Sequence, residues 1–299
     1  MMANHWPLWR RQIAAIVRLE VRKSLFHRRA LILYLLALAP VLLVALLANI
    51  HPTLVRTSAV LDATGHYVRE RTVVQRHGPL QDPAVAPLVF ADLYNAMILR
   101  SVVFFGCVWI FMNLFRAELV DRSLHFYFLA AVRREVLVAG KFIAGLVTAL
   151  TLFSMSTAGA LFFYYQARGY DAAMRDIWDG HGMAQVFTYL GMTWLGCLGY
   201  GALFLTMGLF FRNPIVPALV VYGWEWLNFL LPPVLKKISI IHYLTSLSRV
   251  PLPEGGAAIV AVPTPAYISI PGLVVMTGVL LYLASRRIRS MEINYGGEA

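Results

Sequence analysis

The stretch ALILYLLALAPVLLVALLANI, residues 30–50, contains no charged side chain and decides the class of the fold. A helix needs about 20 apolar residues to cross about 30 Å of hydrocarbon, and this stretch is long enough. The rest of the chain has a similar character, since 59% of its residues are hydrophobic and only 14% are charged. A water-soluble fold could not bury so much apolar surface, so the sequence predicts an all-α integral membrane protein.

Five further apolar runs follow the first, at residues 93–115, 142–165, 185–211, 214–231 and 267–285. When residues 30–50 are counted as the first run, Arg100 interrupts the second run near one end, and the fifth run contains Glu225. The Arg-Asn-Pro break at 212–214 separates the fourth run from the fifth, because proline cannot continue a helix. The sequence therefore predicts six transmembrane helices within one transmembrane domain, residues 30–285.

Basic residues on the two sides of these spans predict the orientation. With both termini inside, the cytoplasmic segments 1–29, 116–141 and 286–299 together with Arg212 hold sixteen Lys and Arg, against nine outside. Lys and Arg concentrate on the cytoplasmic side of membrane proteins. We therefore expect a multi-pass protein of the plasma membrane, the inner membrane in a bacterium, with both termini cytoplasmic. The net charge of +11 is explained by this topology, and no nucleic-acid partner is expected.

The segment before the first span has the pattern of an amphipathic helix. At 3.6 residues per turn one stripe holds Arg11, Arg18, Arg22 and Arg29, and the opposite side holds Trp9, Ile13, Ile16 and Val17. Residues 1–29 are therefore predicted to form a cytoplasmic connecting helix at the inner face of the bilayer, among membrane lipids. Trp9, Arg11, Arg18 and Arg22 are its candidate interfacial residues. The alternative is a basic flank that only fixes topology.

Two outer segments differ from simple turns. Residues 51–92 have balanced charge and several turn formers, so either a small ordered cap or a flexible loop is expected there. Residues 236–266 combine a short apolar run with a glycine- and proline-rich stretch. This second segment predicts short interfacial or re-entrant helices at the outer face before the last span.

Catalytic and metal-binding patterns are not found. The sequence has no metalloprotease His pair, no Gly-x-Ser-x-Gly elbow and no dinucleotide fingerprint. Its Gly140-Lys141 pair lacks the first glycine of a phosphate loop, whose place Glu135 takes. Cys107 and Cys197 fall inside predicted spans, and the eight histidines lack ligand spacing. We expect no catalytic residue, metal or cofactor in this chain, and therefore no enzyme.

The connection between the second and third spans, RAELVDRSLHFYFLAAVRREVLVAGK, residues 116–141, is the most informative part of the sequence. It is charged, yet residues 126–129 form an apolar aromatic knob on the cytoplasmic side. A chain reversal alone requires only a few polar residues. The knob therefore indicates a docking surface for a partner, and the alternative is an interfacial aromatic belt.

This connection resembles that of the ABC-2 type permeases, the membrane subunits of ATP-binding-cassette exporters. The resemblance rests on an acidic residue, Arg-Ser-Leu at 122–124, the aromatic knob, Arg133-Arg134 and Gly140-Lys141, and the connecting helix and the spans extend it over nearly the whole chain. Ala131 departs from the proline common at that place in the family. The resemblance implies a separate cytoplasmic ATPase that binds ATP and Mg, and a second permease copy. The implied ATPase-coupling residues are Glu118, Arg122, Phe126, Tyr127, Arg133 and Arg134.

The resemblance implies that the chain moves a substrate, lipid-like or hydrophobic but not identified by the sequence, across the membrane, powered by ATP hydrolysis in the separate subunit. An alternative is an ABC-coupled structural or mechanotransmitting component that passes no substrate. A secondary transporter is disfavoured because the spans hold few ionisable residues besides Arg100 and Glu225. For those two we predict an intramembrane ion pair; the alternative places Glu225 in an aqueous outer vestibule. The glycines of the fourth span favour either a homodimer interface or packing within one subunit; they are Gly191, Gly196, Gly199, Gly201 and Gly208.

Overall fold

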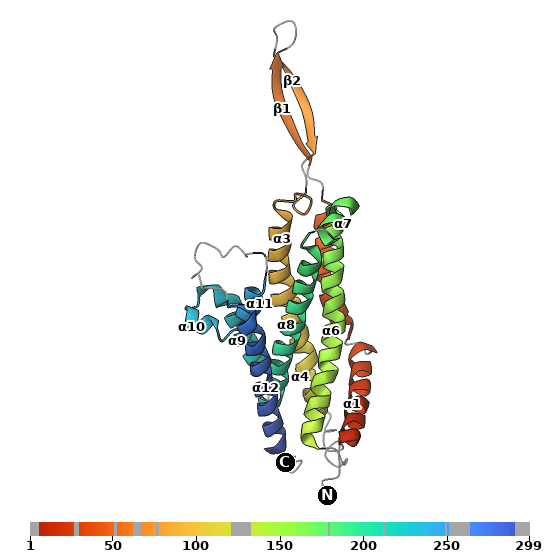
Figure 1. Ribbon diagram of the computed structural model, residues 1–299, viewed down its shortest axis with the longest axis vertical. Helices are drawn as coiled ribbons and strands as arrows, with labels where there is room; N and C mark the ends of the chain where they lie inside the picture. Colours follow the sequence, from red (N-terminus) through yellow and green to blue (C-terminus); the bar gives the residue numbers. More distant parts are fainter. Residues whose placement is uncertain are drawn as a thin grey trace.

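The computed structural model describes residues 6–26, 30–50, 53–61, 67–75, 78–120, 133–178, 180–211, 213–248, 250 and 264–290. Long helices lie side by side in a bundle, and a β-hairpin projects from the end near α3 and α7 (Figure 1). In chain order the elements are α1 Trp6–Phe26, α2 Ala30–Ala48, β1 Thr53–Leu61, β2 Tyr67–Gln75, α3 Ala86–Leu93, the π-helix η1 Tyr94–Val103, α4 Phe104–Val120, α6 Arg134–Ala167, α7 Tyr170–Trp178, α8 Gly182–Phe210, α9 Ile215–Trp226, the 3-10 helix η2 Leu227–Leu230, α10 Pro233–Lys236, α11 Ile240–Ser246 and α12 Ala266–Ser290.

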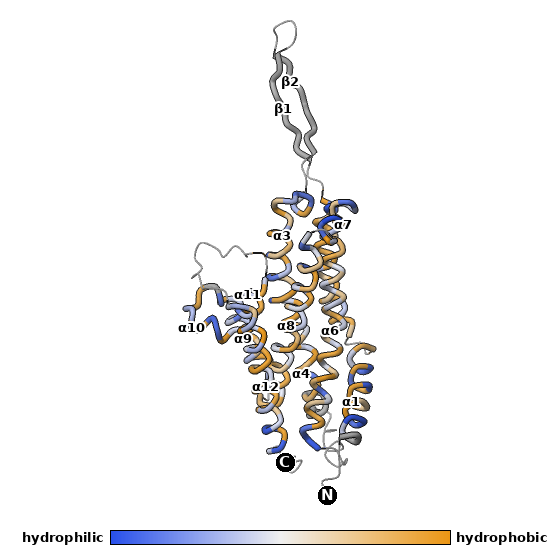
Figure 2. The backbone as a smooth tube through the Cα atoms, in the orientation of Figure 1, coloured by the Kyte–Doolittle hydropathy of each residue, from blue (hydrophilic) through white to orange (hydrophobic). Residues whose placement is uncertain are grey.

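Five helical stretches of the described chain are long and apolar enough to cross a membrane: α2, the continuous Ala86–Phe115 part of α3, η1 and α4, then α6, α8 and α12. Figure 2 shows the apolar residues along these helices, with polar residues at both ends of the bundle. The prediction of a mainly helical chain with several apolar helices of membrane-crossing length is confirmed.

The predicted span at 214–231 is not found as one membrane-length helix, so the count of six is not confirmed. α9 has 12 residues, or about 18 Å at 1.5 Å per residue, well short of about 30 Å. The helix tightens into η2 and stops before Pro232-Pro233, where prolines cannot donate the next backbone hydrogen bonds.

α6 is the spine of the bundle. Its 34 residues make it about 51 Å long, so it exceeds the hydrocarbon thickness by roughly 20 Å. α1 and α2 lie end to end along it and run in the same direction. Ile16 of α1 packs on Gly140, near the start of α6, and the Ser156 hydroxyl further along α6 donates to the Ala37 carbonyl of α2 at 2.6 Å. One helix therefore supports both the connecting helix and the first span.

The core lies between α4, α6 and α8. The ring of Phe111 on α4 is fully buried and fills the space left by Gly145 of α6 and Gly201 of α8. A Cβ atom on either glycine would lie 2.7 or 2.6 Å from that ring. Gly196, Gly199 and Gly208 face other parts of the same chain, whereas the position of Gly191 opens on no heavy atom within 4 Å. Four of the five glycines thus pack within one subunit.

α2 and α12 are the peripheral helices. Only 28% and 22% of their apolar 18-residue segments are buried within the structure, against 67% for each of the three central stretches. Their remaining faces are apolar and exposed, so lipid or a second protein must cover them in a membrane.

The outer segment contains an element that an all-α expectation omits. β1 and β2 pair antiparallel in register from Thr53 with Gln75 to Leu61 with Tyr67. Both strands are rich in Val and Thr and flank a glycine-containing turn sequence, which is a strand signal in the sequence. The second outer segment contains α11, a short helix as expected; residues 251–263 lie outside the described part.

Candidate functional site

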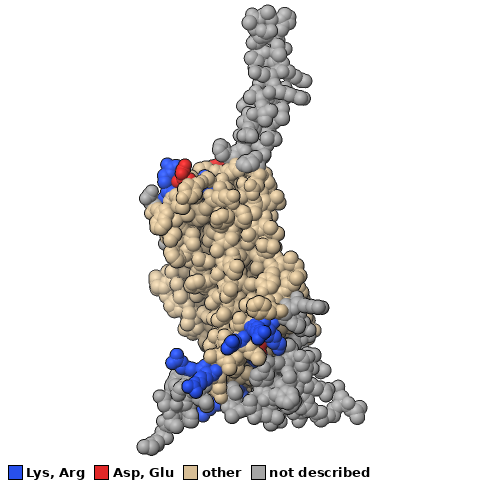
Figure 3. Space-filling model, turned by 90° about the vertical axis from the view of Figure 1, so that its right-hand side faces the viewer, with Lys and Arg blue, Asp and Glu red and all other residues tan. Residues whose placement is uncertain are grey.

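The end of the bundle where α1 and α6 begin and α12 ends is rich in basic side chains, and we call it the basic end. Its exposed Arg and Lys gather below a middle part without charged residues on the face shown in Figure 3. Basic residues there are Arg10, Arg11, Arg133, Arg134, Arg286, Arg287 and Arg289. Arg11, Arg18 and Arg22 of α1 are exposed, while Trp9, Ile13 and Ile16 are half-buried on the opposite side. The amphipathic helix is therefore present, and its apolar side rests on α6.

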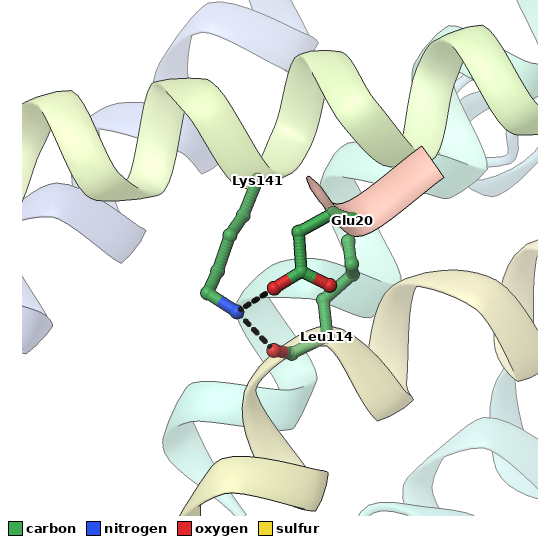
Figure 4. A network of polar contacts seen from close by, with 3 residues as sticks. All are labelled: Glu20, Leu114 and Lys141. Atoms are coloured by element: carbon green, nitrogen blue, oxygen red, sulfur yellow. Dashed lines mark hydrogen bonds and ion pairs between the residues drawn. The ribbon is translucent and has the colours of Figure 1, made fainter. Parts of the chain in front are cut away.

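A buried ion pair locks α1 to the bundle. Lys141 of α6 donates from Nζ to the Glu20 carboxylate at 2.9 Å and to the Leu114 backbone carbonyl at 2.7 Å (Figure 4). Lys141 is 0% and Glu20 3% exposed. The contact joins α1, α4 and α6 at one point. Removing one partner would leave an uncompensated buried charge, so the three helices are held in a fixed arrangement.

Two more contacts support α1 at this position. The Arg133 guanidinium lies 5.1 Å from the centre of the Trp9 ring, a cation–π contact. A Cβ on Gly140 would come within 3.1 Å of the Ile16 side chain, so the helices approach closely there. Small residues permit such close packing.

The start of α6 also holds the end of α12. Arg134 donates from Nη1 to the backbone carbonyls of Ile288 and Arg289, at 3.1 and 2.8 Å. A cation stabilises the carbonyls that a helix leaves unpaired at its C-terminus. Arg289 in turn forms an ion pair with Glu135. The first turn of α6 therefore contacts both the first and the last helix of the chain.

The predicted coupling residues are only partly visible in this arrangement. Glu118 lies in α4, although its side chain is not described, and Arg122, Phe126 and Tyr127 lie outside the described residues. Arg133 and Arg134 have intramolecular partners, Trp9 for the first and the end of α12 for the second. Both lie at the basic end, where α4 ends and α6 begins within the 116–141 connection.

Sequence reasoning missed Lys141 and Glu20 as a pair. The signal was present, because Glu20 follows Ile13 and Ile16 at helical spacing and so continues the apolar stripe of α1. A carboxylate at a core-facing position requires a cationic or hydrogen-bonding partner. Only the fold identifies that partner, since it lies 121 residues away.

A second polar cluster surrounds Glu225. Its carboxylate accepts hydrogen bonds from the Ser239 hydroxyl at 2.7 Å and from the backbone N–H groups of Ile240 and Ile241 at 3.1 and 3.0 Å. These amides belong to the N-terminus of α11, which has no carbonyl partners for them within the helix. The buried Glu225 side chain therefore caps α11, and it is only 4% exposed rather than in an aqueous vestibule.

The predicted ion pair between Arg100 and Glu225 is not formed. Arg100 donates from Nη1 to the backbone carbonyls of Glu225 and Trp226, at 3.2 and 3.3 Å, and lies 5.6 Å from the Trp226 ring centre. The cation thus neutralises the C-terminal end of α9, and the carboxylate neutralises the N-terminus of α11. Each charge has a helix terminus as its partner, which explains why the two side chains do not pair. Arg100 itself lies in the π-helix η1, an element common at functional sites.

Among the described residues, no group of three or more His, Cys, Asp or Glu side chains is placed to hold a metal ion. Cys107 and Cys197 are buried and unbridged. No protein-family model matches the chain, and a search of curated proteins gives no significant match.

Proposed function

We propose that this chain is the permease subunit of an ABC transporter, moving a lipid-like or hydrophobic substrate with ATP and Mg bound by a separate ATPase. One observation carries the proposal: the connecting helix α1 is locked to α4 and α6 through Lys141 and Glu20. This lock lies at the basic end, next to the connection that carries the aromatic knob and the Arg-Arg pair.

The lock favours transmission of force. A push on the ends of α4 and α6 would move α1 with them, because a close-packed interior transmits displacement rather than absorbing it. α6 is about 51 Å long, so a small tilt at the basic end becomes a larger movement at the other end. Such rigid-body tilting of spans is a known route to alternating access.

In the proposed topology the basic end is cytoplasmic. α1 begins and α12 ends at this end of the bundle (Figure 1). Termini on one side require an even number of crossings, so the chain between α8 and α12 must return across the membrane. We propose that α9, η2, α10 and α11 together make this return, stabilised by Arg100 and Glu225. Excess Lys and Arg at the basic end agrees with the cytoplasmic assignment.

The functional unit is proposed to be a dimer. Buried aromatic rings fill the space between α4, α6 and α8, among them Phe104, Phe111, Phe153, Tyr200 and Phe204. A substrate path between two copies would leave this packing intact. The exposed apolar faces of α2 and α12 provide surface for the second copy.

The test is coexpression of the full chain with candidate ABC ATPases from the same genome, followed by reconstitution in liposomes. We expect a stable complex with equal numbers of both chains, and ATP hydrolysis that changes when the permease is present. Glu20→Gln should lower this coupling. Asp176→Asn in α7, which breaks an ion pair with Arg168, should leave it unchanged. Failure to associate would refute the proposal, and coupling without any substrate movement would favour the mechanotransmitting alternative.

A further inference from the structure

The two sides of α1 differ in charge. Its one acidic residue, Glu20, points into the bundle and is neutralised by Lys141. The exposed side carries Arg18, Arg22 and Lys23, and none of these forms an ion pair within the described part of the chain. The buried pair therefore leaves the outer side of α1 with positive charge that no carboxylate of the same helix offsets.

A surface hollow coincides with this positive side. It is open to solvent, and its volume is about 740 Å³. The described residues that line it all belong to α1: Ala15, Arg18, Leu19, Arg22, Lys23 and Phe26. Three cations and two large apolar side chains thus share one surface.

The apolar part of this lining requires a cover. Phe26 is 83% and Leu19 55% exposed, and they lie beside the cations rather than on a separate face. The first span begins four residues after Phe26, and its Leu31 and Leu35 are exposed as well. Exposed apolar side chains are therefore present both in the hollow and at the start of the hydrocarbon-crossing helix.

We propose that this hollow binds an anionic phospholipid of the surrounding bilayer. Its phosphate would lie between Arg18, Arg22 and Lys23, since guanidinium groups bind phosphate oxygens in a bidentate manner. One acyl chain would lie on Leu19 and Phe26 and continue along α2. A soluble anion would satisfy the cations but leave both apolar side chains in water. This inference does not depend on the proposed transport function, because it requires no ATPase.

The test measures lipid binding to the full chain in detergent by native mass spectrometry, with phosphatidylglycerol and phosphatidylcholine as probes. We expect phosphatidylglycerol to bind about ten- to a hundredfold more tightly than phosphatidylcholine, as three cations near one anionic headgroup allow. Arg18→Gln with Arg22→Gln should remove most of this preference. The matched control is Arg10→Gln with Arg11→Gln, which removes the same charge from exposed positions of the same helix outside the hollow.

Two further measurements distinguish a phospholipid from other ligands that could occupy the hollow. Leu19→Ala with Phe26→Ala keeps every cation and should weaken phosphatidylglycerol binding, which also provides a test if the arginine variant does not fold. Inorganic phosphate at millimolar concentration should not displace the lipid. Three results would each overturn the proposal. The control pair could lose as much lipid preference as the arginine pair, or inorganic phosphate could displace the lipid completely. The arginine substitutions could also release a protein bound at the hollow while the lipid preference stays unchanged.

Discussion

Arg100 donates to the backbone carbonyl of Glu225 at 3.2 Å, and the carboxylate of the same residue is bound instead by Ser239. Two charges that the sequence predicts to pair are therefore close in the fold but have different partners. Each stabilises one terminus of a short helix, α9 or α11. The short helices before α12 depend on this pair of contacts, because they are too short to be stable alone.

We expect Glu225→Gln to couple more strongly to Ser239→Ala than to Arg100→Gln. The glutamine substitution leaves the backbone carbonyl that Arg100 binds, so the two losses should add to within about 0.5 kcal/mol, whereas contacting pairs couple by up to about 3 kcal/mol. Double-mutant cycles of unfolding in detergent measure both terms. If Arg100→Gln restored stability to the Glu225→Gln protein, a direct ion pair would be indicated.

Breaking the pair between Lys141 and Glu20 from one side should be costly. Lys141→Met or Glu20→Gln alone is expected to destabilise the protein by about 3–5 kcal/mol, because a buried charge loses its partner. Replacing both residues by Met and Leu should recover most of this loss. The comparison is Asp176→Asn, which removes a partly exposed pair with Arg168 and should cost only about 0.2–1 kcal/mol. Similar losses for Lys141→Met and Asp176→Asn would contradict the buried lock.

Packing around Phe111 gives a further prediction. Gly201→Ala would place a Cβ 2.6 Å from the Phe111 ring, and overpacking of a core costs about 1–3 kcal/mol. Phe111→Leu should recover part of that loss in the Gly201→Ala protein. Gly191→Ala, on the same helix but without a heavy atom within 4 Å, should be neutral or stabilising by up to about 1 kcal/mol. Thermal unfolding of the purified protein distinguishes these outcomes.

The aromatic knob is predicted to transmit force from the ATPase, so this test rests on the proposed function. Phe126→Ala with Tyr127→Ala should weaken ATPase binding by at least about 2 kcal/mol, since buried aromatic residues dominate many interfaces. Membrane insertion should stay intact. Phe162→Ala removes an exposed aromatic ring from α6 and is the control. Normal binding and coupling in the doubly substituted protein would show that the connection only joins two helices.

The long apolar helices could be predicted from the sequence because membrane crossing depends on local composition. Residues 30–50 predict α2, which ends at Ala48. The prediction for the third span begins at 142, yet α6 begins at Arg134. Hydropathy stops at polar residues such as Lys141, whereas the helix continues because Glu20 satisfies that charge.

The candidate sites could be predicted only in part, because their partners are distant in the sequence. Ser239 reaches Glu225 across the Pro232-Pro233 break, and no periodicity relates the two residues. The sequence predicts that Arg100 lies near Glu225 but does not specify the atom that Arg100 binds. That choice depends on how α9 and α11 end, which is set by backbone geometry.

The spine arrangement of α6 also has a consequence for biogenesis. Glu20 leaves the ribosome 121 residues before Lys141, a delay of about 6–24 s at roughly 5–20 residues per second. During that interval the first span can insert while the carboxylate of the preceding helix is still hydrated. α1 can therefore form this contact only after the start of α6 has been made, so a nascent chain arrested before Lys141 would hold an inserted first span with an undocked amino-terminal helix.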